Sequence, residues 1–233
     1  MVSLGHLRKQ QQMTDRWRNW RSARHTGPMR KSYDQAYFQH WYRDDRRGIG
    51  RAALLRQKVA LAVAVAEFHL QRPLRSVLDV GCGEGVWRAP LLALRPKLDY
   101  LGIDASEYAV ARYGHTRNLR LVRFGQLDQL RFGAPVDLLV CSDVLHYLDA
   151  RELRRGLKGF SELCDGVGFF ETFCRGDDII GDRLSFHPRS ADFYRRAFAD
   201  AGFTACGSHC YLSQSLRGEA TALELTASTH REA

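Results

Sequence analysis

The fold is most evident from the segment Ser76-Val77-Leu78-Asp79-Val80-Gly81-Cys82-Gly83-Glu84-Gly85, in which strand-forming residues lead into a glycine-rich turn and then a helical pattern. In open α/β sheets, ligands bind beyond the carboxyl ends of the strands, and the turn after the first strand is the usual nucleotide site. The glycines have the spacing G-x-G-x-G, and Val86 stands where the dinucleotide fingerprint G-x-G-x-x-G needs its third glycine. The turn therefore predicts a nucleotide-like ligand and disfavours NAD.

Two carboxylates indicate the chemical class of the predicted ligand. Asp79 lies two residues before the first glycine, where it would repel a pyrophosphate but attract an ammonium group, so it favours an adenosine-sulfonium ligand. Asp104 ends the next predicted strand, at a place where a carboxylate accepts both hydroxyls of a ribose. The structural alternatives are that Asp79 bonds to the backbone of its own turn and that Asp104 caps the following helix, although Ser106 already suits that role.

From residue 75 onward, strand-like and helical patterns alternate along the chain, which is typical of a parallel sheet covered by helices. The predicted strands are 75–80, 99–104, 119–124, 136–141 and 167–173, and the predicted helices lie near 86–95, 106–114 and 149–164. A polar insertion at 174–189 and a helix at 191–201 follow. The last two strand candidates, 203–212 and 220–227, are joined through 216–218 and predict an antiparallel hairpin. We expect an α/β fold with a seven-stranded, mostly parallel sheet and helices on both faces.

The segment before the first strand predicts a basic arm at 1–31 and an N-terminal helical cap at 32–73. The arm holds eight lysine and arginine residues against the single acid Asp15, so it carries +7 of the net charge of +9. Its tryptophans, Trp17 and Trp20, suit RNA binding, but a solvated helix or a frayed terminus is the preferred interpretation. The cap contains the aromatic residues Tyr33, Tyr37 and Trp41 at helical spacing.

Six cysteines without an apolar export segment predict reduced thiols and a cytoplasmic protein. Cys206 and Cys210 flank His209, but no second pair has zinc-ligand spacing, so no metal is expected. The longest apolar stretch, 59–66, is far short of the ~20 residues that span a bilayer, so no membrane segment is expected.

Over residues 74–227 the sequence resembles the class I S-adenosylmethionine-dependent methyltransferases. Leu78-Asp79-Val80-Gly81-Cys82-Gly83-Glu84-Gly85 matches the first motif of that family, and Asp104 matches its ribose-binding acid. Cys141-Ser142-Asp143-Val144-Leu145-His146-Tyr147-Leu148 resembles the segment that closes over the cofactor and faces the substrate. The resemblance implies a Rossmann-like methyltransferase fold whose last strand is antiparallel, and a domain at 74–233 that binds S-adenosylmethionine.

The resemblance also implies a set of site residues. The cofactor would contact Asp79, Gly81, Gly83, Gly85, Asp104, Ala105, Gln126, Leu127, Ser142 and Asp143. Gln126 stands where the family often has an acid that accepts the adenine amino group, and Asp128 is the alternative. The substrate wall would comprise Tyr33, Tyr37, Trp41 and Tyr147, although an aromatic stripe more often packs in a core.

Methyl transfer from a sulfonium is an in-line displacement, so alignment and desolvation supply most of the catalysis. A general base is needed only if the acceptor holds its proton, and His146 is the first candidate because its ordinary pKa is near ~6.5. Glu171 and His187 are the other candidates. The predicted function is methyl transfer to a small molecule, the alternatives being an RNA methyltransferase that uses the basic arm or a non-catalytic cofactor-binding subunit. The sequence specifies neither the acceptor atom nor the oligomeric state.

Overall fold

The computed structural model describes residues 33–42, 51–178, 182–221 and 223. The basic arm predicted at 1–31 lies outside the described residues. Tyr33–Ala233 forms one compact unit, which contains both the predicted cap and the predicted cofactor-binding domain.

The described residues form a sheet of seven strands in the order β3-β2-β1-β4-β5-β7-β6. The strands are β1 Ser76–Val80, β2 Asp99–Asp104, β3 Leu119–Leu121, β4 Val136–Ser142, β5 Cys164–Glu171, β6 Thr204–Gly207 and β7 Cys210–Leu212. The first five are parallel, and β7 runs antiparallel to both of its neighbours, β5 and β6. The predicted mostly parallel sheet with an antiparallel last strand is confirmed.

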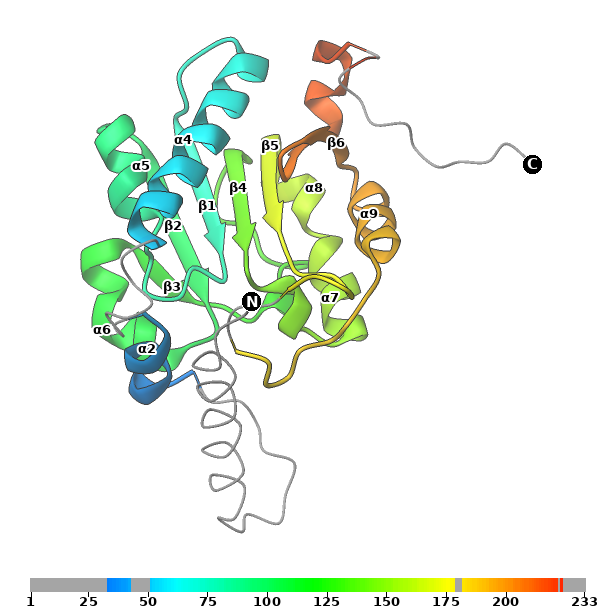
Figure 1. Cartoon of the computed structure of the whole chain (residues 1–233). Helices are drawn as coiled ribbons and strands as arrows, with labels where there is room; N and C mark the ends of the chain where they lie inside the picture. Colours follow the sequence, from blue (N-terminus) through cyan, green and yellow to red (C-terminus); the bar gives the residue numbers. More distant parts are fainter. Residues whose placement is uncertain (1–32, 43–50, 179–181, 222, 224–233) are drawn as a thin grey trace, which may run out of the picture. The chain divides into compact units, whose positions relative to one another are not determined.

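Helices cover both faces of the sheet (Figure 1). They are α2 Gln35–Tyr42, α4 Arg51–Leu70, α5 Arg88–Leu94, α6 Glu107–Arg117, α7 Ala150–Leu157, α8 Phe160–Leu163 and α9 Ala191–Asp200, with the 3-10 turns η1 Phe124–Gln126, η2 Leu145–Tyr147 and η3 Gln214–Glu219. One core cluster joins α4 and α5 to the sheet, and the other joins α7, α8 and α9 to its opposite face.

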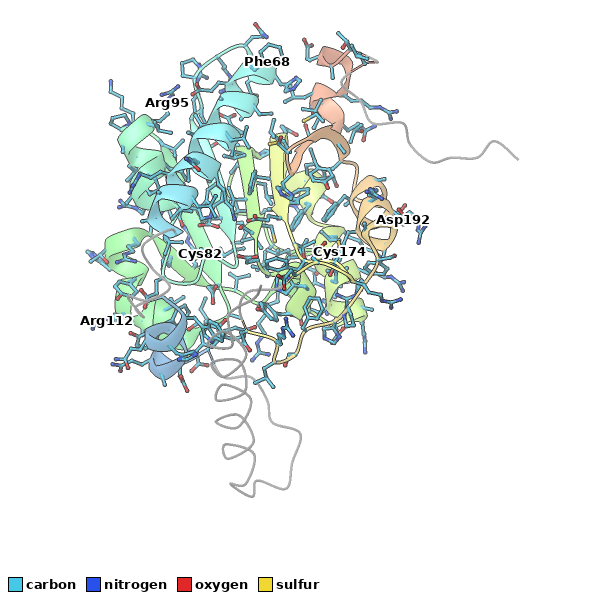
Figure 2. All side chains as sticks on the ribbon, viewed as in Figure 1. Phe68, Cys82, Arg95, Arg112, Cys174 and Asp192 are labelled. Carbon is cyan, nitrogen blue, oxygen red and sulfur yellow. The ribbon has the colours of Figure 1, made fainter. Side chains whose placement is uncertain are left out.

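The long helix α4 lies within the segment predicted as the helical cap. Its fully buried residues Val59, Ala62, Val63 and Ala66 recur at the i, i+3, i+4, i+7 spacing of one helix face, and that face packs on the sheet. Figure 2 labels Phe68 on the opposite, exposed side of the same helix.

The prediction of one continuous helix at 149–164 is wrong, because the chain forms two helices there, α7 and α8. Asp149 caps α7 by accepting hydrogen bonds from the backbone N–H groups of Arg151 and Glu152 at 2.8 Å. At Gly159, between the two helices, the backbone lies so close to the carbonyl oxygen of Leu127 that a Cβ would be 1.9 Å from it. This close approach holds the end of α7 against the segment that follows β3.

The predicted hairpin between 203–212 and 220–227 is also wrong. The hairpin lies entirely within the first of these segments, because β6 and β7 pair with each other around Ser208 and His209, which have φ of 49° and 63°. Non-glycine residues with positive φ are uncommon, and the turn signal in this segment is Gly207-Ser208, which the prediction missed; Gly207 has φ of 104°. Residues 214–219, where the turn was expected, form η3 instead, and the described residues of 220–227 are not in a strand.

All six cysteines are free thiols, as expected. The described residues contain no helix with the length and apolarity that a membrane crossing requires.

Candidate functional site

The glycine turn follows β1 and adopts a conformation that side chains rarely tolerate. Gly81, Gly83 and Gly85 have φ of 70°, 54° and 73°. The N–H groups of Gly81 and Cys82 donate to the carbonyl oxygen of Ile103 at 2.8 and 3.1 Å, which fixes the turn to the end of β2. Figure 2 labels Cys82 in this turn. A Cβ on Gly81 would be 2.3 Å from Cγ2 of Val144, so the backbone can follow this path only without a side chain.

Asp104 ends β2 beside that turn. One carboxylate oxygen accepts a hydrogen bond from the N–H of Gly83 at 2.7 Å, and the other accepts one from the N–H of Ser106 at 2.8 Å. Burial raises the pKa of Asp104, and these backbone N–H groups counteract part of that rise. A carboxylate has about four acceptor sites, so Asp104 keeps capacity for two further donors.

The glycine turn and Asp104 line one pocket at the carboxyl ends of the parallel strands. Its lining includes eight residues of the predicted site: Gly81, Gly83, Asp104, Ala105, Asp143, Tyr33, Tyr37 and Tyr147. The other lining residues were not predicted: Phe38, Val80, Ile103, Val122, Phe124, Val144, Leu148 and Glu152. The lining contains three carboxylates and three phenols but, among the described residues, no lysine or arginine.

The cap segment forms one wall of the pocket. The hydroxyl of Ser106 donates to the carbonyl oxygen of Tyr33 at 2.6 Å, and the same oxygen atom of Ser106 caps α6 by accepting from Ala109. Phe38 is buried and stacks on Tyr108 of α6, with ring centroids 5.7 Å apart. These contacts hold Tyr33 and the start of α2 over Asp104.

The insertion at 174–189 holds the opposite wall through η2. The Tyr147 hydroxyl donates to the carbonyl oxygen of Asp182 at 2.8 Å. The guanidinium of Arg189 donates to the carbonyl oxygen of Leu148 at 2.6 Å, and the N–H of His187 donates to that of His146 at 2.8 Å. Tyr147 is thus fixed in the pocket wall by the insertion.

Comparisons with known proteins bear directly on this arrangement. A protein family described as a methyltransferase domain matches residues 78–170. The chain is 29% identical over 155 residues to the ribosomal RNA large subunit methyltransferase G of Aeromonas salmonicida, a match covering 61% of this chain and 38% of that protein. It is 35% identical over 78 residues to the trans-aconitate 2-methyltransferase of Deinococcus radiodurans, covering 34% of this chain and 30% of that protein. A sugar N-methyltransferase from Streptoalloteichus superposes with a TM-score of 0.57 at 16% identity, covering 82% of this chain and 98% of that one.

The chain contains a methyltransferase domain of the class I S-adenosylmethionine-dependent family at residues 78–170. Its fold is the Rossmann-like fold of that family. The matches span only about a third of the length of the two curated relatives.

S-adenosylmethionine is the cofactor of this family, and the residues of this methyltransferase fit it. The side-chain-free surface of Gly81 leaves room for close approach by a ligand. The pocket combines the acceptor capacity of Asp104 with apolar side chains and further carboxylates, which suits a ligand that has a ribose, a flat purine and a sulfonium.

Some predicted cofactor contacts of this methyltransferase lie outside the pocket lining. Gln126 accepts the N–H of Arg123 through its side-chain oxygen at 2.9 Å, so it caps η1. Leu127 is fully buried in the core cluster beneath α7. Ser142 donates to Glu171 at 2.7 Å, and Gly85 also lies away from the lining. These contacts stay predictions.

The candidate bases of the methyltransferase also lie outside the lining, as does Trp41. His146 is buried, and its Nδ1 lies 3.1 Å from the hydroxyl of Thr172, with its ring against Tyr147. Glu171 forms an ion pair with Lys58 at 2.5 Å, so the ammonium group of Lys58 balances its negative charge. His187 meets the site through its backbone N–H. A base role for any of the three stays a prediction.

Asp79 is buried beneath the glycine turn of the methyltransferase. It accepts a hydrogen bond from the hydroxyl of Tyr100 at 2.8 Å and does not line the pocket. Burial raises the pKa of Asp79 to about 7, against the lowering effect of that hydrogen bond. The folded chain therefore favours the protonated carboxyl at a pH where the unfolded chain is ionised.

This gives a testable dependence of stability on pH. Because its folded pKa is raised, Asp79 contributes most to stability below its unfolded pKa of about 4, and that contribution is lost as the pH rises toward about 7. The amide in Asp79→Asn cannot ionise. The free energy of unfolding of the variant should therefore rise relative to that of the wild type by roughly 1 kcal/mol per pH unit across that window. Urea denaturation of both proteins at pH 5 and pH 8 measures this gain. An equal difference at both pH values would contradict the burial argument.

Proposed function

We propose that this methyltransferase transfers the methyl group of S-adenosylmethionine to a small-molecule acceptor. One observation carries the proposal: Tyr33, Tyr37 and Tyr147 line the same pocket as Gly81 and Asp104. Aromatic walls with a few polar groups are typical of small-molecule sites. The absence of lysine and arginine from the described lining disfavours a phosphate-rich acceptor at the reacting end.

In this proposal, the cofactor when bound supplies an electrophilic methyl group, and the chain supplies alignment. Asp104 and the glycine turn hold the cofactor, while Tyr147 and Tyr33 orient the acceptor and exclude water. Burial raises the pKa of both phenols, with further contributions from Asp182. Both phenols therefore stay protonated at neutral pH, and because Tyr147 donates its proton to the carbonyl oxygen of Asp182, its hydroxyl oxygen can only accept from a substrate.

The test is transfer of labelled methyl from S-adenosylmethionine into two separate pools, a low-mass metabolite fraction and total RNA. We expect label in the metabolite fraction, with loss of at least about 10-fold in Tyr147→Ala and a smaller loss in Tyr147→Phe, which keeps the ring but not the hydroxyl that is anchored to Asp182. Cofactor binding without transfer into either pool would favour the non-catalytic subunit.

A second candidate is RNA methylation, which a basic groove between α7 and α9 favours. Arg154 of α7, Lys158 at the C-cap of that helix and Arg196 of α9 line this groove, together with the acid Asp200, over a floor that includes Leu157 and Phe193. Within the described part of the chain, no ion pair engages these three cations. Three adjacent cations beside an apolar floor suit an RNA strand with phosphates and stacked bases. Ribosomal RNA is also the substrate in the name of one relative.

This candidate predicts salt-dependent RNA binding that the groove supports. The triple variant Arg154→Ala, Lys158→Ala, Arg196→Ala should reduce the magnitude of the slope of log K against log salt by roughly 2 if each cation contacts one phosphate of a single strand. The matched control is Arg195→Ala, because Arg195 lies on the same helix but pairs with Asp192. An unchanged slope in the triple variant would exclude the groove as an RNA site.

A further inference from the structure

The pocket has two ends, and the strand order assigns them to different parts of the cofactor. Gly81 follows β1, Asp104 ends β2, and Val122 and Phe124 follow β3, which is the order of these strands across the sheet. A ligand whose ribose binds Asp104 therefore extends toward β1 and β4 on one side and toward β3 on the other. Because Val122 and Phe124 are apolar, a flat purine fits the β3 side, and the methionine part fits the side of Gly81 and Asp143.

The residues that the sequence offers for the purine amino group lie outside the pocket lining. The side-chain oxygen of Gln126 accepts the N–H of Arg123, which turns it back onto its own 3-10 turn. Asp128 forms an ion pair with Arg155 at 2.9 Å. Neither residue lines the pocket.

A different carboxylate reaches this end of the pocket from α7. Glu152 lies in the first turn of that helix and lines the pocket next to the segment after β3. A Cβ on Gly125 would be 3.3 Å from Cγ of Glu152 and 3.8 Å from its Oε1, so the carboxylate lies directly against the backbone at Gly125. Within the described residues, no hydrogen bond or ion pair occupies the Glu152 carboxylate.

Packing between α7 and η1 keeps Glu152 in this position. A Cβ on Gly156, one turn after Glu152, would be 2.5 Å from the carbonyl oxygen of Phe124, so the helix touches the 3-10 turn directly. Asp149 caps the helix and fixes where Glu152 falls in its first turn. The carboxylate is therefore held by the fold and not by a side-chain partner.

We propose that Glu152 accepts a hydrogen bond from the exocyclic amino group of the adenine and so selects an adenosine cofactor. This inference rests on the proposed cofactor function and adds to it a residue that neither the glycine motif nor the ribose acid identifies. A carboxylate accepts but does not donate, so it distinguishes an amino group from a hydrogen or a carbonyl oxygen at the same ring position.

The test measures cofactor-product binding by calorimetry and needs no methyl acceptor. The two ligands are S-adenosylhomocysteine and its purine analogue, which carries hydrogen in place of the 6-amino group. The wild type should bind the analogue about 10-fold or more weakly, because a hydrogen bond to a charged group is lost. Glu152→Met should bind the two ligands within about 3-fold of each other, and Glu152→Gln should keep part of the preference because its amide oxygen still accepts.

The competing assignment is tested by Gln126→Met, which removes the acceptor that the sequence suggests; with Glu152 as the acceptor, this variant should keep the wild-type preference. A wild-type preference in Glu152→Met, or its loss in Gln126→Met, would overturn the assignment while leaving the cofactor site in place. Binding of neither ligand by folded wild-type protein would instead refute the cofactor function itself, and the assignment with it. Thermal melting of each variant shows that it is folded at the temperature of the titration.

Discussion

Asp104→Ala is expected to weaken binding of S-adenosylmethionine and S-adenosylhomocysteine by at least about 100-fold. Hydrogen bonds to a charged group contribute ~1.5–3 kcal/mol each, and the ribose offers two hydroxyls to this carboxylate. The same carboxylate accepts the N–H of Gly83 at 2.7 Å, so the variant also releases the glycine turn. Both effects act on the cofactor, and calorimetric titration measures their sum.

Two further variants separate the ribose contact from a general loss of structure. Asp104→Asn keeps one carbonyl acceptor and the side-chain shape, so its loss should be intermediate. Asp99→Ala removes an exposed acid at the opposite end of the same strand and should leave binding unchanged. If folded Asp104→Ala binds the cofactor as tightly as the wild type, Asp104 has no part in the site.

The parts of the site that the sequence predicted are those set by short-range spacing. The conformation of Gly81 and Gly83 follows from the turn between a strand and a helix, and Asp104 follows from the end of the next strand. In a parallel sheet these positions meet at one edge, whatever the rest of the chain does. A local motif was therefore enough to place them together.

Glu152 could not be predicted in the same way, because long-range packing brings it to the pocket. In the sequence Glu152 lies near the start of the predicted helix at 149–164, and nothing in that pattern indicates which neighbour the helix touches. The contact depends on Gly156, which lets α7 lie against Phe124. Gln126 was the residue in the expected linear position, but η1 turns its side chain onto the backbone of Arg123.

The error in the final hairpin has a related cause. Its turn uses Ser208 and His209 with positive φ, so no Asn-Gly or Asp-Gly pair marks it. The Gly218 turn signal lies instead in η3. The position of the candidate base His146 also depends on long-range packing. Its ring contacts Phe186 of the insertion, and the sequence alone does not indicate where the insertion packs.

Gly81→Ala should abolish cofactor binding and lower the free energy of unfolding by about 2–5 kcal/mol. A φ of 70° costs an L-residue roughly 1–2 kcal/mol, and overpacking costs typically ~1–3 kcal/mol. The new methyl group would be 2.3 Å from Cγ2 of Val144, whose branched side chain has little freedom to turn away. The turn must then move, and with it the backbone that faces the ligand.

Gly85→Ala is the matched control, because Gly85 has nearly the same φ of 73° but does not line the pocket. Its Cβ would be 3.0 Å from Cδ2 of Leu119, a milder contact with the end of a flexible side chain. The difference between the two variants in urea denaturation therefore measures the clash with Val144 apart from the backbone strain. Adding Val144→Ala to Gly81→Ala removes the two clashing carbons and should recover part of the stability and of the cofactor affinity. If the double variant is no better than Gly81→Ala, the turn fails through backbone strain alone and Val144 does not set its position.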